Sequence, residues 1–147
     1  MSGFSQFINP ARRSVPTPDH LIGPDGQSVF GTFESEFRSM DLVKTKKPTH
    51  APQWLNSKKL TLWEACEVHV KEGILLTAVS DMGVFGLYMI QFWDRESNQI
   101  FYFSENVSGS GLGIAPNLLD GSVTSARKKQ HFVKFANHFE NGEAALF

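Results

Sequence analysis

Glu64 is the residue of this chain whose type and position indicate chemistry most clearly. It lies in a segment of alternating polar and apolar residues and shares a face with Leu62, Cys66 and Val68. A carboxyl group that points into an apolar interior could act as a general acid and protonate an alkene or an epoxide. Two structural alternatives stay open: an anchor paired with an arginine or a backbone donor, and a bulge that turns the side chain outward.

The other reactive residue types do not form a recognisable site. None of the five histidines has the spacing to a carboxylate or cysteine that a zinc site needs, so we expect no metal and no other cofactor. The single cysteine, Cys66, lies among apolar residues, which favours an inert side chain over a nucleophile. The run Gly109–Gly113 lacks both the dinucleotide fingerprint and the P-loop lysine, and we expect a flexible connector there.

The strands that must position these residues are indicated by a period of two from residue 60 onward. Turn residues separate the alternating segments, and no long helical pattern interrupts them. This series predicts a mainly β fold, an antiparallel meander that closes completely or incompletely toward a barrel or sandwich. The expected strands are Leu60–Val70, Ile74–Asp81, Leu87–Asp94, Gln99–Glu105, Gly121–Ala126, His131–Phe139 and Glu143–Phe147.

Residues 1–59 differ in composition from residues 60–147 and predict an extended or irregular N-terminal arm. Six of the seven prolines fall in this arm, where they remove backbone donors and disfavour helix. Gly23–Gly26 predicts a tight turn. Thr32–Met40 could form one or two helical turns, and Asn141-Gly142, near the other end of the chain, predicts a type I′ hairpin turn.

Charge and hydropathy exclude several classes of partner. The chain has 14 basic and 15 acidic residues among 147, and such a balance gives no basic face for nucleic acid. The longest apolar run, Val84–Ile90, is far shorter than the roughly 20 residues of a membrane-spanning helix. Residues 1–18 lack the apolar core of a secretory signal, so we expect a cytoplasmic protein. Arg12 and Arg13 among serines leave an organellar transit peptide as the alternative.

Several short motifs follow one another in a defined order. They are Lys59-Leu60-x-x-Trp63-Glu64, Ser80-Asp81-x-Gly83-x-x-Gly86, Phe92-x-Asp94 and Gly111-Leu112-x-x-Ala115-Pro116. In order and spacing they resemble the N-terminal part of the uncharacterised family catalogued as domain of unknown function 2804. The similarity runs from about residue 18 to the end of the chain.

Members of that family are distantly related to calycin-like double barrels such as carotenoid hydratases and plant tocopherol cyclases. The resemblance therefore implies a lipocalin-like β-barrel with an apolar pocket, and it implies no established activity. This chain has Ala65-Cys66 where the family carries a tyrosine pair, and Gly83-Val84-Phe85 where the family favours Gly-Tyr. These differences remove phenolic hydroxyls that could act as acids.

Aromatic side chains crowd the expected strands and suit the lining of an elongated apolar pocket. We expect a small apolar ligand to contact Trp63, Glu64, Asp81, Tyr88 and Phe92, although Asp81 has the alternative of bonding to the backbone of the following turn. The first function that stays open is a lipocalin-like module that binds a small hydrophobic molecule, with or without catalysis. The second is a non-enzymatic structural or interaction subunit of a larger assembly.

The last expected strand, residues 143–147, predicts a partner. An apolar strand at the end of a sheet leaves unpaired backbone groups, which natural proteins usually cover. We expect a second copy of the chain or a partner protein to cover it, with closure by the N-terminal arm as the alternative.

Overall fold

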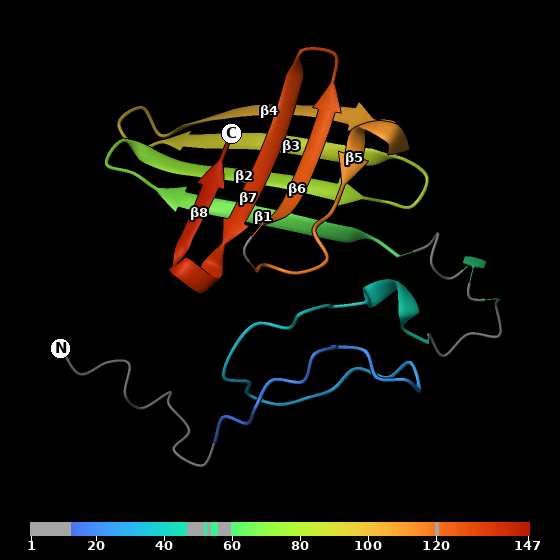
Figure 1. The fold of residues 1–147 in the computed structure, drawn as a ribbon. Helices are drawn as coiled ribbons and strands as arrows, with labels where there is room; N and C mark the ends of the chain where they lie inside the picture. Colours follow the sequence, from blue (N-terminus) through green and yellow to red (C-terminus); the bar gives the residue numbers. More distant parts are fainter. Residues whose placement is uncertain (1–12, 47–51, 53, 56–59, 120) are drawn as a thin grey trace.

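The computed structural model describes residues 13–46, 52, 54–55, 60–119 and 121–147, whose fold is shown in Figure 1. Its strands form two antiparallel sheets of four strands each. The prediction of a mainly β chain is therefore confirmed, whereas the described strands do not close into a barrel. Within the same residues, no helix is long and apolar enough to cross a membrane.

The first sheet is a meander in the order β1-β2-β3-β4. All of its strands agree with the expected segments to within two residues at either end, because a period of two is a strong local signal. The strands are β1 (Leu62–His69), β2 (Gly73–Asp81), β3 (Gly86–Asp94) and β4 (Gln99–Val107).

The second sheet has the order β5-β6-β7-β8 and contains one strand that the sequence did not predict. The supposed connector Gly109–Gly113 instead forms a 3-10 helix, η3 (Gly109–Gly111), followed by a short strand that pairs with β6. A Cβ atom on Gly111 would lie 2.5 Å from the carbonyl oxygen of Arg127, so glycine allows this close approach. The strands are β5 (Leu112–Gly113), β6 (Ser122–Lys128), β7 (His131–His138) and β8 (Glu143–Leu146).

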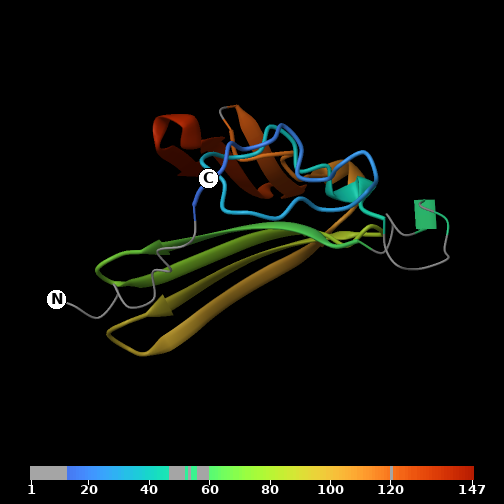
Figure 2. The same cartoon turned by 90° about the horizontal axis from the view of Figure 1, so that it is seen from below.

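The two sheets pack face to face, and their strands cross at a steep angle (Figure 1). The buried core lies between them and consists of Val79, Tyr88, Val107, Ala126, Val133 and Phe135. Figure 2 shows that the β1–β2 and β3–β4 hairpin ends of the first sheet extend beyond the second sheet. The second sheet therefore covers only part of the first sheet, and the two hairpin ends project past it (Figure 2).

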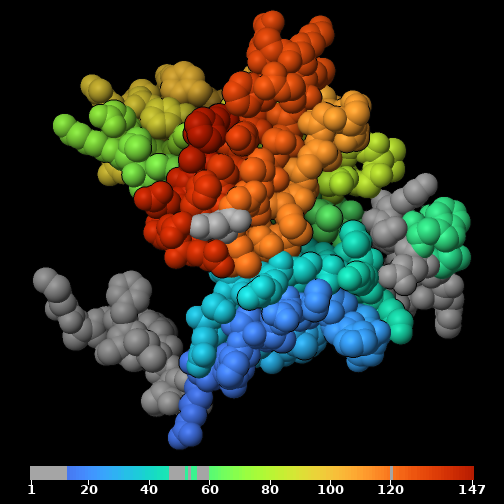
Figure 3. All heavy atoms as spheres, in the orientation of Figure 1, coloured from blue at the N-terminus to red at the C-terminus, as the bar shows by residue number. Residues whose placement is uncertain are grey.

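The described part of the N-terminal arm, residues 13–46, packs beside the second sheet (Figure 3). The Met40 N–H donates to the carbonyl oxygen of Pro116 at 3.0 Å, and the Asn117 side-chain amide donates to the Arg38 carbonyl oxygen at 2.6 Å. The predicted end of the arm at residue 59 lies outside the described residues, as do Arg12 and His50.

Within the arm, the predicted turn is confirmed and the predicted helical turn is wrong. The Gly26 N–H donates to the Gly23 carbonyl oxygen at 2.9 Å, which closes the turn. Thr32–Met40 forms no helix, because the Ser35 N–H donates instead to the Thr17 hydroxyl at 2.9 Å. A single 3-10 turn, η2 (Leu42–Lys44), follows that segment.

The connection between β7 and β8 also differs from its prediction. A type I′ turn requires positive φ at both Asn141 and Gly142. Gly142 has a φ of 73°, but Asn141 belongs to a 3-10 helix, η4 (Phe139–Asn141), and does not have a positive φ. The loop is therefore longer than two residues, and only its glycine adopts the left-handed conformation.

Candidate ligand-binding site

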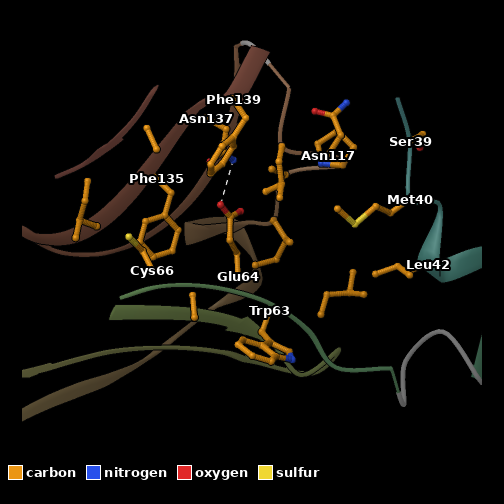
Figure 4. Close-up of a pocket in the computed structure, with 18 of the residues that line it drawn as sticks. Ser39, Met40, Leu42, Trp63, Glu64, Cys66, Asn117, Phe135, Asn137 and Phe139 are labelled. Atoms are coloured by element: carbon orange, nitrogen blue, oxygen red, sulfur yellow. Dashed lines mark hydrogen bonds between the residues drawn. The ribbon is translucent and has the colours of Figure 1, made fainter. Parts of the chain in front are cut away.

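A cavity of about 630 Å³ lies where the arm, the start of β1, the β5–β6 connection and the β7–β8 end of the second sheet meet. Figure 4 shows its lining, which comes from segments that are far apart in the sequence. The volume is in the usual range for small-molecule pockets. Most of the wall is apolar, with side chains that include Met40, Leu42, Leu62, Ile114, Phe135 and Leu146.

Glu64 brings a charged group into this apolar wall. The alternation of β1 places Glu64 on the same face as Leu62 and Cys66, which also line the cavity. The predicted inward orientation of Glu64 is confirmed by its contacts with the second sheet, described next.

Two buried residues of the second sheet hold the Glu64 carboxylate. The Thr124 hydroxyl on β6 donates to Oε2, and the Asn137 Nδ2 on β7 donates to Oε1 at 3.0 Å. Thr124 in turn accepts a hydrogen bond of 2.7 Å from the Ala115 N–H. The carboxylate is therefore oriented by donors and also links the two sheets.

Sequence reasoning missed both of these partners. Thr124 and Asn137 are 60 and 73 residues away from Glu64, so no local spacing connects them to it. A signal was present nonetheless, because Asn137 shares a face of β7 with Val133 and Phe135. A polar residue in line with core residues needs a hydrogen-bond partner.

Asn117 forms the part of the cavity rim that holds the arm. Its side-chain amide donates to Arg38, and its Oδ1 accepts a 3.0 Å hydrogen bond from the Leu119 N–H. The Ser122 hydroxyl donates to the Asn117 carbonyl oxygen at 2.9 Å. This residue thereby fixes the β5–β6 connection and the arm segment that closes the cavity.

The structure brings together only part of the predicted contact set. Trp63 and Glu64 line the cavity, whereas Asp81, Tyr88 and Phe92 are not part of its lining. Asp81 accepts a 2.7 Å hydrogen bond from the Gly83 N–H at the turn after β2. This is the alternative role given for Asp81 above, a bond to the backbone of the following turn.

Tyr88 is buried in the core and donates a hydrogen bond to Glu105. Burial, together with the hydrogen bond to Glu105 and the negative charge of Glu105, raises the pKa of Tyr88 to about 12. The pKa of Glu105 is lowered, first by the hydrogen bond from Tyr88 and then by His131 and Lys128. Neither Tyr88 nor Glu105 lines the cavity.

Cys66 is half-buried, lines the cavity and packs against the core. Among the residues that the structure describes, no group of three or more His, Cys, Asp or Glu side chains could hold a metal ion. The cavity lining thus includes two carboxylates, Asp41 and Glu64, together with amide groups and one thiol in a mostly apolar wall. Asp41 is already engaged by His20 at 2.6 Å and by Lys44 at 3.0 Å.

No family model, curated protein or solved structure matches this chain. Its function is therefore inferred from the cavity and from Glu64.

Proposed function

We propose that this chain is a lipocalin-like module that binds a small hydrophobic molecule in the cavity beside Glu64. The observation that carries the proposal is the Glu64 carboxylate, which Thr124 and Asn137 orient in a largely apolar cavity of about 630 Å³. Pockets of this kind bind by burying apolar surface and orient the ligand through a few polar groups.

The carboxylate also indicates which end group the ligand carries. A carboxylate has about four acceptor positions, and Thr124 and Asn137 each donate one hydrogen bond. The remaining capacity accepts a donor, so an apolar ligand with a hydroxyl or amine end fits. A ligand with a carboxylate end is disfavoured, because two like charges would meet in a poorly solvated site.

The test uses Cys66 as a reporter, because it is the single cysteine of the chain and lines the cavity. The rate of alkylation by N-ethylmaleimide is measured with 1-decanol, decylamine or decanoate below their micellar concentrations. We expect decanol and decylamine to slow the alkylation of Cys66, and decanoate to leave the rate nearly unchanged.

The matched control moves the cysteine out of the cavity. Val84 is 81% exposed in the turn between β2 and β3 and does not line the cavity, so the double variant Cys66→Ser, Val84→Cys carries one exposed thiol. Its alkylation should not respond to decanol. Equal slowing at both positions, or no slowing at Cys66 up to the solubility limit of decanol, would contradict the proposal.

A further inference from the structure

β4 is the longest edge strand of the two described sheets. β4 has nine residues and forms the end of the first sheet, and no backbone hydrogen bond among the described residues reaches its outer side. The other edge strands are β1, which is one residue shorter and carries Glu64, Glu67 and His69, and β5 and β8, which have two and four residues.

β4 lacks the features that usually protect such an edge. Natural edge strands carry lysine, proline or a bulge, and Gln99–Val107 contains no lysine or proline. Its one charged residue, Glu105, is engaged by Tyr88, by His131 at 3.3 Å and by Lys128 at 3.8 Å. Among the residues that the structure describes, the outer edge of β4 therefore has no backbone partner and no unengaged charge to oppose pairing.

Large apolar side chains line both faces of this edge. Ile100 and Tyr102 lie on the outer face and are 61% and 59% exposed, and Phe101, on the opposite face, is 57% exposed. With Phe103 they leave about 400 Å² of apolar surface open in each copy, on the scale of 150–250 Å² per aromatic residue. A standard interface buries about 800 Å² per partner, so these four residues would supply roughly half, before the strand backbone and neighbouring side chains are counted.

We propose that β4 pairs antiparallel with β4 of a second copy, so that the two first sheets form one continuous sheet of eight strands. A two-fold axis perpendicular to the sheet keeps each residue on its own face, and the strands then cross at a residue that faces itself. This interface does not depend on the proposed ligand, because β4 contributes no residue to the cavity lining.

The side chains of β4 favour a crossing at Tyr102. In that register Phe101 lies opposite Phe103 of the second copy, and Gln99 lies opposite Glu105 of the second copy, an amide against a carboxylate. A crossing at Phe103 would instead place Phe101 opposite Glu105. Aromatic pairs directly opposite one another stabilise a sheet, whereas a charge opposite an aromatic side chain loses that contribution.

Sedimentation velocity of the purified chain from 1 to 100 µM, a concentration range chosen on the order of typical dimer affinities, tests the association. We expect the mass to rise toward twice the 16.4 kDa of one chain. Tyr102→Lys places two lysines opposite each other at the axis and should keep the chain monomeric. Val84→Lys, an equally drastic change at an exposed turn, should leave the dimer intact. A wild-type monomer throughout, or the same mass for both variants, would overturn the proposal.

Cysteine cross-linking tests the register of the two strands and does not depend on whether the Tyr102→Lys variant folds. In a Cys66→Ser background, Tyr102→Cys should form a disulfide-linked dimer on mild oxidation, since opposed Cα atoms lie about 4.5–5.5 Å apart. Ile100→Cys is the control, because its Cα atoms would be about 14 Å apart across the same axis. Equal cross-linking at both positions, or cross-linking at Ile100 alone, would overturn the crossing at Tyr102.

Discussion

Tyr88 and Glu105 face each other across β3 and β4, and the Tyr88 hydroxyl donates a 2.5 Å hydrogen bond to Oε2 of Glu105. Glu105 is also approached by Lys128 on β6 and His131 on β7. The carboxylate thus joins a core tyrosine of the first sheet to the hairpin of the second sheet.

Tyr88→Phe should lower the free energy of unfolding by about 1.5–3 kcal/mol, the usual contribution of a hydrogen bond to a charged group. The substitution keeps the ring in the core and removes only the hydroxyl. Urea unfolding followed by circular dichroism measures the change. Tyr102→Phe is the control at the other tyrosine of the chain, which is exposed, and should change stability by less than about 0.5 kcal/mol.

Ionisation of Tyr88 should also destabilise the fold at high pH. Its pKa is raised to about 12 from an ordinary value of 10.0, so the folded state holds this proton more tightly than the unfolded chain. The resulting stability is complete below pH 10 and is lost as the pH rises through about 12. Absorbance at the phenolate band in Tyr102→Phe isolates Tyr88. If Tyr88 ionised near its ordinary pKa of 10.0 while the protein stayed folded, its pKa would not be raised by burial and Glu105.

Glu105 affects the stability of the fold at low pH, and its contribution is lost as the pH falls. Because its pKa is lowered below the ordinary value of 4.5, its contribution is complete above that value and is lost as the pH falls through the lowered pKa. The difference in unfolding free energy between the wild type and Tyr88→Phe should therefore narrow between about pH 7 and pH 3, since the hydrogen bond from Tyr88 is the largest cause of the shift. A difference that stays constant over this range would contradict the assignment.

The sequence predicts the strands well because their signal is local. Alternation within Leu62–His69 favours an inward Glu64 over the outward bulge, and its contacts with Thr124 and Asn137 show the inward orientation. The alternation contains no information on how β4 connects to the next strand. This connection decides whether the strands form one barrel or two sheets. The tight turn at Gly109–Gly111 carries the chain away from β4, so that Leu112 pairs with Ala126 on β6 instead.

The candidate site was predictable only in part for the same reason. Glu64 follows from the alternation of one strand and lines the cavity, whereas Trp63 borders the cavity although its side chain lies on the other face of β1 and is 65% exposed. Tyr88 and Phe92 were chosen because they are aromatic, but the packing of the second sheet decides which aromatic residues border a cavity. Asn137 approaches Glu64 only through the crossing of the two sheets.

The link between Glu64 and Asn137 should appear as a coupling energy. In a double-mutant cycle with Glu64→Gln and Asn137→Ala, we expect a coupling of about 1–3 kcal/mol, because a buried amide donates to a carboxylate. Glu67 and His69, an exposed pair on the same strand, provide the control with Glu67→Gln and His69→Ala. Their coupling should be below about 1 kcal/mol, as for other exposed pairs. Equal coupling in the two cycles would contradict a buried link.

Gly73 begins β2 at a point where no side chain fits. It is buried, and a Cβ atom at this position would lie 1.9 Å from the carbonyl oxygen of Trp93. Because the obstacle is backbone in the paired strand β3, relief requires the two strands to separate. We therefore expect Gly73→Ala to lower the free energy of unfolding by more than about 2 kcal/mol.

Gly113 is the matched control for this substitution, because it also lies in a strand but has no atom within 4 Å of its Cβ position. Its backbone is outside the left-handed region, so alanine fits without strain. Gly113→Ala should leave stability unchanged or raise it by up to about 1 kcal/mol, since alanine restricts the unfolded chain. Urea unfolding of both variants decides the point. Similar stability of the two variants would mean that β2 and β3 are not in close contact at Gly73.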